Sequence, residues 1–434
     1  QGQSFYDAIF IRPSLPAKPL KNLPSEHLKG LGVILRDRHG TPDEVYFFIK
    51  CGKIYSHFHY DEGAFFAFAD GVPILDEYGI QYGSGTDENG QTVSGSAPRC
   101  HNAISFSATP TDRECYNRGY VTRFLTQPYA DYAVCEMPVH LLHMKPELSL
   151  WGFQGEEAPY GWWRRHILFV KPYGFFFYDQ LESEFTATLD LNFKADAYRT
   201  VAGLNRVYQG RYGTDIPVCV NFPTDGPARD GRLDMKANAS AFPKFSTMES
   251  VSPELKDTFY NQVSWHIGTR PNSDFSWSFA WGKPEAHAVL RPLGSGAPGS
   301  VLERADGVTR AVVTPALKPA VAVEADGLIY SGWAGAMTER PDGTTELIQM
   351  AGNVIGVSKG LHLHGDGPFR AVIQGKRATV ELDGRARWIE VHGVKARRLT
   401  LNGRKAETES AGPRGARRVA IPVGRQTRLD IEYR

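Results

Sequence analysis

The sequence lacks the cysteine spacing of zinc ribbons and thioredoxin-like proteins. Its 434 residues include five cysteines, and none of them forms a Cys-x-x-Cys pair. The odd number leaves at least one thiol unpaired within the chain, and the count does not decide the redox compartment. The sequence also has no GxSxG, P-loop or GxGxxG motif in a suitable context, so it gives no indication of a serine hydrolase or a nucleotide-binding protein.

Long apolar runs are also absent. None approaches the roughly 20 residues that a transmembrane helix needs, so we expect no membrane span. The net charge of +1 gives no general attraction to polyanions, and we expect no nucleic-acid partner. The first residues contain neither Met nor a basic segment followed by an apolar one. We therefore expect that the chain follows a processing site or is a piece of a longer protein.

What the sequence contains is a succession of short β-type segments. Examples are GVILRDRHG, EVYFFIKCG, AFFAFADGVPIL and HILFVKPYGFFFYDQL, which are apolar or alternating and end in Gly, Asp or Pro. After residue 30, no window of 11–18 residues has a convincing helical period. The pattern predicts an all-β protein built on a large antiparallel β-sandwich.

The length favours more than one domain, because 434 residues exceed what one compact core usually organises. The segment GSGAPGS at 294–300 has the composition of a linker, and shorter β segments follow it. We predict an extended lead-in at 1–30, a β-sandwich domain at 31–296 and a smaller C-terminal β domain at 297–434.

The C-terminal part has an excess of positive charge, because from residue 301 onward there are 21 Lys and Arg residues and 15 Asp and Glu residues. This excess suits either an acidic polymer or a solvated face.

One stretch, HFHYDEGAFFAFADGVPILDEYG, suggests a metal site. In an extended segment His57 and His59 share one face, and Asp76 lies in an apolar strand where an unpaired carboxylate would be costly. His101 opens a later strand, HNAISF. Two imidazoles and a carboxylate suit Zn²⁺, and a hydrogen-bonded polar cluster is the alternative.

The local geometry sets a condition on that site. A tight hairpin at Asp70-Gly71 would place Asp76 several residues from His59 along the ladder. The strand must therefore bend near Gly63, as a glycine bulge would allow, or the loop must be wider.

Three segments together resemble the β-sandwich domain of the heparinase II/III-like polysaccharide lyases. They are SHFHYDEGAFFAFADGVPILDEYG, RCHNAISF and WWRRHILFVKPYGFFFYD, within residues 30–180. That family shows an HxHxDxxxF segment, a Gly-initiated strand with an acid, a His-Asn strand opening and an Arg-initiated strand that ends in Asp. The resemblance implies that His59, Asp76 and His101 hold a structural zinc and that His57 is catalytic.

The same resemblance implies a lyase that cleaves a uronic-acid polymer, such as a glycosaminoglycan or alginate, by β-elimination. In this family an upstream helical (α/α) toroid supplies a Tyr, another His and groups that neutralise the substrate carboxylate. The given sequence has no such region, so we expect that the helical part was removed, that it is a separate chain, or that this protein works differently. The alternatives are a non-catalytic carbohydrate-binding or scaffold module with a structural zinc, and a uronate epimerase. A periplasmic or secreted location is implied by the resemblance alone.

Two further stretches, WWRR and LHLHGDG, contain residues that could bind a ligand. Trp162, Trp163, Arg164 and Arg165 are candidates for stacking on and pairing with an acidic sugar, and a strand edge with core tryptophans is the alternative. In the C-terminal part, LHLHGDG holds a second histidine pair, His362 and His364, with Asp366. We interpret this stretch as a strand end with a turn rather than a metal site.

Overall fold

In the computed structural model the chain is an all-β protein, as the sequence predicts. The structure describes residues 22–52, 61–70, 72–75, 84–86, 92–94, 101–106, 114–115, 119–141, 161–183, 187–193, 197–200, 206–211, 214–221, 232–236, 261–267, 273–281, 289–294, 299–314, 323–412 and 415–434. Within these ranges every regular element is a strand, all pairings are antiparallel and no α-helix occurs. Accordingly, no helix in the described ranges is long and apolar enough to cross a membrane.

The first sheet has five strands in chain order. They are β1 (Glu26–Leu28), β2 (Gly32–Asp37), β3 (Val45–Lys50), β4 (Phe65–Ala69) and β5 (Val72–Leu75). In β3 and β4 buried residues alternate with partly exposed ones, which is the pattern of a sheet with one face on a core.

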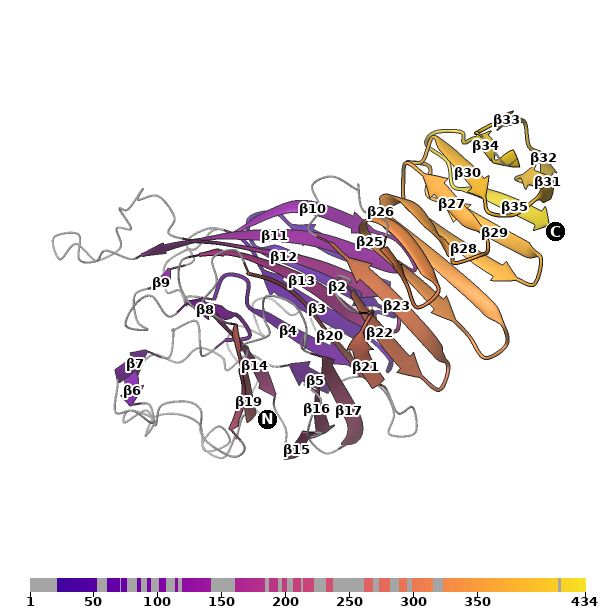
Figure 1. Ribbon diagram of the computed structural model, residues 1–434. Helices are drawn as coiled ribbons and strands as arrows, with labels where there is room; N and C mark the ends of the chain where they lie inside the picture. The colour runs from indigo at the N-terminus through magenta and orange to yellow at the C-terminus, as the bar shows by residue number, and fades with distance from the viewer. Residues whose placement is uncertain are drawn as a thin grey trace, which may run out of the picture.

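A central sheet of nine strands covers the buried face of the first sheet (Figure 1). Its members are β9 (Glu114–Cys115), β10 (Tyr120–Thr126), β11 (Ala130–Leu141), β12 (Gly161–Val170), β13 (Gly174–Ser183), β15 (Ala197–Thr200), β16 (Arg206–Arg211), β17 (Thr214–Asn221) and β20 (Ser273–Trp281). A four-stranded sheet contains β8 (Ile104–Phe106), β14 (Ala187–Phe193), β18 (Arg232–Lys236) and β19 (Asn261–Ile267). A separate pair is formed by β6 (Ser84–Thr86) and β7 (Thr92–Ser94).

The C-terminal part is one sheet of 15 strands. Its strands are β21 (Val289–Pro292), β22 (Gly299–Arg304), β23 (Gly307–Val313), β24 (Val323–Ala325), β25 (Leu328–Glu339), β26 (Thr344–Val357), β27 (His362–Gly365), β28 (Phe369–Gln374), β29 (Arg377–Leu382), β30 (Trp388–His392), β31 (Ala396–Leu401), β32 (Arg404–Lys405), β33 (Thr408–Ser410), β34 (Arg417–Ala420) and β35 (Thr427–Tyr433). The predicted domain boundary at 297 falls outside the described residues, and β21 before it already pairs with β22 after it.

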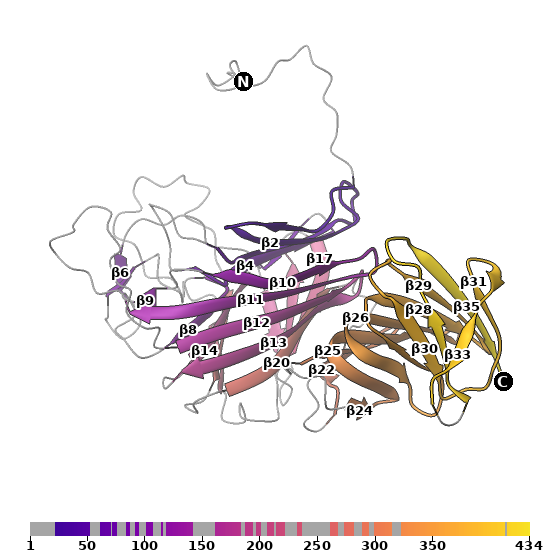
Figure 2. The same ribbon diagram turned by 90° about the horizontal axis from the view of Figure 1, so that it is seen from above.

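Three cores hold these sheets together. The first lies between the five-stranded and central sheets, and the second lies within the curled C-terminal sheet. A third core joins the other face of β11, β12, β13 and β20 to β22, β23, β25 and β26. The two parts of the chain therefore share an apolar interface, and they lie side by side when seen from above (Figure 2).

This layering explains the long apolar runs of β12 and β13. Phe169 and Phe175 face the first core, whereas Leu168 and Phe176 face the third. Strands that are covered on both faces need apolar residues at successive positions rather than alternation. The aromatic residues are mostly core here: the rings of Phe177 and Trp277 stack 3.9 Å apart.

Candidate functional site

The predicted zinc site is described only in part. His57, His59 and Asp76 lie outside the described residues. The third predicted ligand, His101, is buried, with 2% of its surface exposed. Its neighbour Asn102 is fully buried and donates a hydrogen bond of 2.8 Å to the carbonyl oxygen of Phe65. The start of this segment is thus fastened to the start of β4.

The predicted bend at Gly63 is present. Gly63 has a φ of 80°, in the left-handed region, and its N–H donates to the carbonyl of Lys50 at 2.8 Å. The N–H of Lys50 in turn donates to the carbonyl of Ala64 at 2.9 Å, so two residues oppose one as in a glycine bulge. A Cβ at Gly63 would lie 2.4 Å from the Trp163 ring, so a side chain is also excluded by packing.

Arg165 and Asp179 form a fully buried ion pair beside this bend. Arg165 donates to both carboxylate oxygens of Asp179, from Nε at 2.8 Å and from Nη2 at 2.9 Å. The indole N–H groups of Trp163 and Trp277 donate to the same carboxylate at 2.8 and 2.7 Å. Arg165 Nη1 also reaches the carbonyl of Gly63, at 3.4 Å. The pair therefore joins the central sheet to the five-stranded sheet.

These contacts decide between the two interpretations of the WWRR stretch. Trp163 and Arg165 have no exposed surface, so a substrate-binding role is wrong for both of them. Strand alternation turns Trp162 and Arg164 to the opposite face of β12, where Trp162 is 40% exposed. Of the four residues of this stretch, Trp162 and Arg164 therefore have the side chains that solvent reaches.

The surface around Trp162 and Arg164 is polar and concave. A cavity of about 190 Å³ there is lined by Glu136, Trp162, Trp163, Arg164, Gln180 and Glu182. Arg164 donates to the Glu136 carboxylate at 2.9 Å, which holds the guanidinium beside the indole. An aromatic ring next to a positioned cation can bind a sugar ring that carries a carboxylate.

A buried acid, Glu62, lies within the Gly63 bend. One of its carboxylate oxygens accepts a hydrogen bond from the Gly52 N–H at 2.9 Å, and the other lies 3.6 Å from Lys50 Nζ. Nζ of Lys50 also donates a hydrogen bond to the Asp61 carboxylate and forms an ion pair with it. Burial raises the pKa of Glu62 to about 7, although Lys50 and Gly52 favour its charged form.

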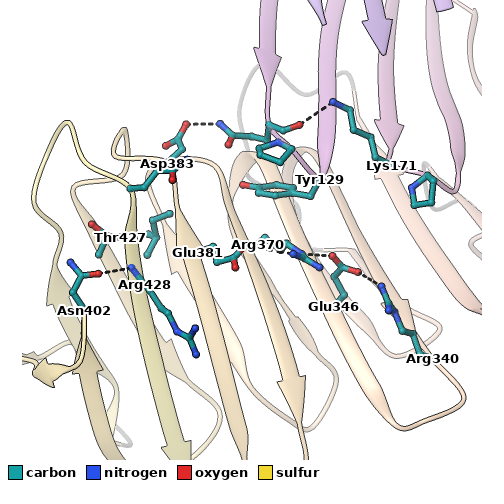
Figure 3. Close-up of a pocket in the computed structure, with 15 residues that line it drawn as sticks. Tyr129, Lys171, Arg340, Glu346, Arg370, Glu381, Asp383, Asn402, Thr427 and Arg428 are labelled. Atoms are coloured by element: carbon teal, nitrogen blue, oxygen red, sulfur yellow. Dashed lines mark hydrogen bonds and ion pairs between the residues drawn. The ribbon is translucent and has the colours of Figure 1, made fainter. Parts of the chain in front are cut away.

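A larger cavity of about 560 Å³ separates the ends of the central strands from the C-terminal sheet (Figure 3). Gln127 reaches across it and donates to Asp383 at 2.6 Å. On the C-terminal side, Glu346 accepts from Arg370 at 2.5 Å and from Arg340 at 3.3 Å. The charges that line this cavity are thus largely engaged with one another, and they connect the two parts of the chain.

The C-terminal sheet brings together a cluster that the sequence motif did not reveal. His364, Glu390 and His392 place one donor atom each within 4.8 Å of the others. Glu390 and His392 lie 26 and 28 residues after His364 in the sequence, and the pairing of β27 with β30 brings the three together. Burial and the nearby His392 lower the pKa of His364 to about 4. Asp366 does not join the cluster but binds Arg387.

Comparisons with known proteins find similar chains among solved structures. No protein-family model matches the sequence, and no curated protein matches it significantly. Among solved structures, a heparan sulfate lyase from Pedobacter heparinus matches with a TM-score of 0.47 and 14% identity, over 65% of this chain and 41% of that one. A heparinase III matches with a TM-score of 0.44 and 12% identity, over 67% and 41%.

The chain is thus similar to solved heparan sulfate lyase and heparinase III structures, the family that its sequence motifs resemble. It spans about 41% of the length of the first two of these structures.

Replacing Asp179 by Asn should lower the free energy of unfolding by about 3–5 kcal/mol, because the buried Arg165 guanidinium would lose its counter-charge. Urea unfolding followed by tryptophan fluorescence measures this change. Glu136→Gln is the matched control, since it breaks the half-exposed pair with Arg164 and should cost about 1 kcal/mol or less. Equal effects of the two substitutions would contradict the structural role of the buried pair.

Glu62 should make stability depend on pH. Its pKa in the folded chain is raised above the ordinary value of 4.5, so the folded state binds the proton more tightly. The free energy of unfolding should therefore fall as the pH rises from about 4.5 to 7, by about 3 kcal/mol from this group. The stability of Glu62→Gln relative to the unsubstituted chain should rise by a similar amount between pH 5 and 8. A difference that stays constant over this range would refute the assignment.

Proposed function

We propose that this chain is the β-sandwich portion of a polysaccharide lyase that cleaves a uronic-acid polymer by β-elimination. The observation that carries the proposal is the convergence of three separate motif elements on residues 63–65. Asn102 binds the carbonyl of Phe65, Arg165 binds the carbonyl of Gly63, and Trp163 covers Gly63. Elements that are distant in sequence thus form one structural unit, as expected if the motif series describes one site rather than chance matches.

The chemistry requires three groups. A base must remove the proton at C5 of the uronate, an acid must protonate the departing C4 oxygen, and the carboxylate must be neutralised to stabilise the developing enolate. We assign His57 to one of the two proton transfers. The neutralising group and a catalytic Tyr would come from a helical toroid, either a domain or a partner chain.

Trp162 and Arg164 supply a surface for an acidic saccharide in this proposal. The exposed indole offers a stacking face, and the adjacent guanidinium offers a charge and a hydrogen-bond donor for the uronate carboxylate. A periplasmic or secreted location would fit an enzyme that acts on such polymers.

A structural zinc held by His59, Asp76 and His101 belongs to the same proposal. His101 suits this role because imidazole nitrogen is a common zinc ligand and its side chain is buried. The ion would fix the segments that precede β4 and β8 and would orient His57 from the neighbouring position. It would have no part in the proton transfers.

The alternative class is a carbohydrate-binding or scaffold module that keeps the zinc and has no catalytic activity. The charges that line the larger cavity are mostly paired with one another, and the cavity beside Trp162 is small. Both features suit a binding module better than an unrelated class of enzyme. A uronate epimerase would share the proton abstraction and differ in the product.

The full polypeptide, including any helical part, should release unsaturated uronate products from at least one acidic glycan. Absorbance in the ultraviolet detects them with heparan sulfate, chondroitin sulfate, hyaluronan and alginate as substrates. His57→Ala should reduce the rate by about 10²–10⁴-fold because a proton-transfer group is lost. Trp162→Ala should mainly raise KM.

Other outcomes of this assay separate the alternatives. Binding to a glycan without product would favour the module. Inverted uronate stereochemistry in an uncleaved polymer, detected by NMR, would favour the epimerase. Full activity of His57→Ala would remove this residue from the mechanism.

The purified chain should contain one equivalent of zinc that depends on His59, measured by elemental analysis. His59→Ala should lose this equivalent and melt at a lower temperature, because the metal stabilises only the folded state. Equal zinc contents and equal melting temperatures in the two chains would contradict a zinc site at His59.

A further inference from the structure

A second metal site is suggested by the strand pairing in the C-terminal sheet. In the register of β27 and β30, His364 lies directly opposite Glu390, and His392 follows Glu390 by two residues. All three side chains therefore project from the same face of the sheet. The intervening residues Leu363 and Val391 point into the core and fix this orientation, since both are almost fully buried.

The donor atoms of the cluster already lie close together. Nε2 of His392 is 2.8 Å from Oε2 of Glu390, and Nδ1 of His364 is 3.9 Å from the same oxygen. The two imidazole rings stack with centroids 3.9 Å apart. Around a tetrahedral zinc with bonds of 2.0–2.2 Å, donor atoms are separated by about 3.3–3.5 Å. The two measured separations lie on either side of this range, so small side-chain movements would complete the site.

Glu390 is held in place by Arg418 from the neighbouring strand β34. Two nitrogens of Arg418 donate to Oε1 of Glu390, at 2.7 and 2.5 Å. This arrangement leaves Oε2 directed toward the two histidines. A carboxylate ligand that is oriented by a further hydrogen-bond partner is typical of metal sites.

The third histidine of this region, His362, has a different partner. His362 lies opposite His392 in the register, but its Nε2 is 3.1 Å from the carbonyl oxygen of Val357. It is therefore not counted as a ligand. Because His362 projects from the same face of the sheet, it can serve as the control position when the cluster residues are substituted.

We propose that His364, Glu390 and His392 bind a divalent transition metal ion of the zinc class. Two imidazoles and one carboxylate suit Zn²⁺, Co²⁺, Ni²⁺ or Cu²⁺, whereas Ca²⁺ and Mg²⁺ prefer oxygen ligands alone. The side chains of His364 and His392 are 31% and 23% exposed. Solvent therefore reaches the site, and a water molecule or an external ligand can occupy the remaining coordination position.

This site is independent of the zinc proposed at His59. It lies in the C-terminal sheet, and its ligands come from two adjacent strands of that sheet. Failure of one metal assignment would therefore leave the other unaffected. The alternative for the cluster is a hydrogen-bonded His–Glu–His group that takes no metal.

Titration of the metal-depleted full chain with Zn²⁺ and with Co²⁺ tests the proposal. Calorimetry gives the number of Zn²⁺ sites, and the visible absorption of Co²⁺ reports imidazole ligands in a near-tetrahedral geometry. Relative to the unsubstituted chain, His364→Ala and His392→Ala should each weaken one site by at least about 100-fold, because the loss of even an outer partner costs 10–100-fold. His362→Ala, the matched control, should retain that site.

Each result bears on the proposal. Selective loss in the His364 and His392 variants supports it. Equal Zn²⁺ binding by all four chains overturns it, and so does equal weakening by His362→Ala, which would indicate nonspecific binding to surface histidines. Urea unfolding checks that each variant is folded. If His392→Ala is unstable, His364→Ala alone decides, since it leaves the Glu390–Arg418 pair intact.

Discussion

The buried ion pair of Arg165 and Asp179 is the interaction on which the N-terminal sandwich depends. Burying two charges is favourable only when geometry and hydrogen bonding compensate for the lost solvent. Here each oxygen of Asp179 accepts two donors, one from Arg165 and one from an indole. The guanidinium lies 4.4 Å from the Trp163 ring centre and 5.3 Å from that of Trp277. The pair thus fixes the positions of aromatic residues as well as of charges.

The same pair determines where the first sheet can bend. Its contact with the carbonyl of Gly63 ties the bulge after β3 to the centre of the sandwich, and Trp163 leaves no room for a side chain there. Asn102 fastens the next segment to Phe65, two residues further along. The buried His101, the one proposed zinc ligand in the described ranges, therefore lies beside a residue that is fastened to this framework. Such support is what a preorganised site requires.

The sequence predicts much of the fold, because strand alternation and turn residues are local properties. A bend near Gly63 was one of two alternatives that the sequence left open, and a wider loop was the other. The orientation of the WWRR stretch was not predictable, because each face of β12 receives one Trp and one Arg there, so the sequence does not distinguish the buried face from the exposed one. Glu390 and His392 were missed for a different reason. Only the pairing of β27 with β30 brings them to His364, and sequence spacing does not encode that register.

The two His-x-His motifs of the chain show what such a motif can and cannot establish. Alternation places both imidazoles of the pair on one face, which is why the motif suggests a metal. In the C-terminal pair the histidines nevertheless have different partners: His362 binds a backbone carbonyl, and His364 joins a carboxylate and an imidazole from the next strand. The neighbouring strand, not the motif, assigns the roles. The same division is proposed for His57 and His59, where a carboxylate and a third histidine from later segments would select one imidazole for the metal and leave the other for substrate.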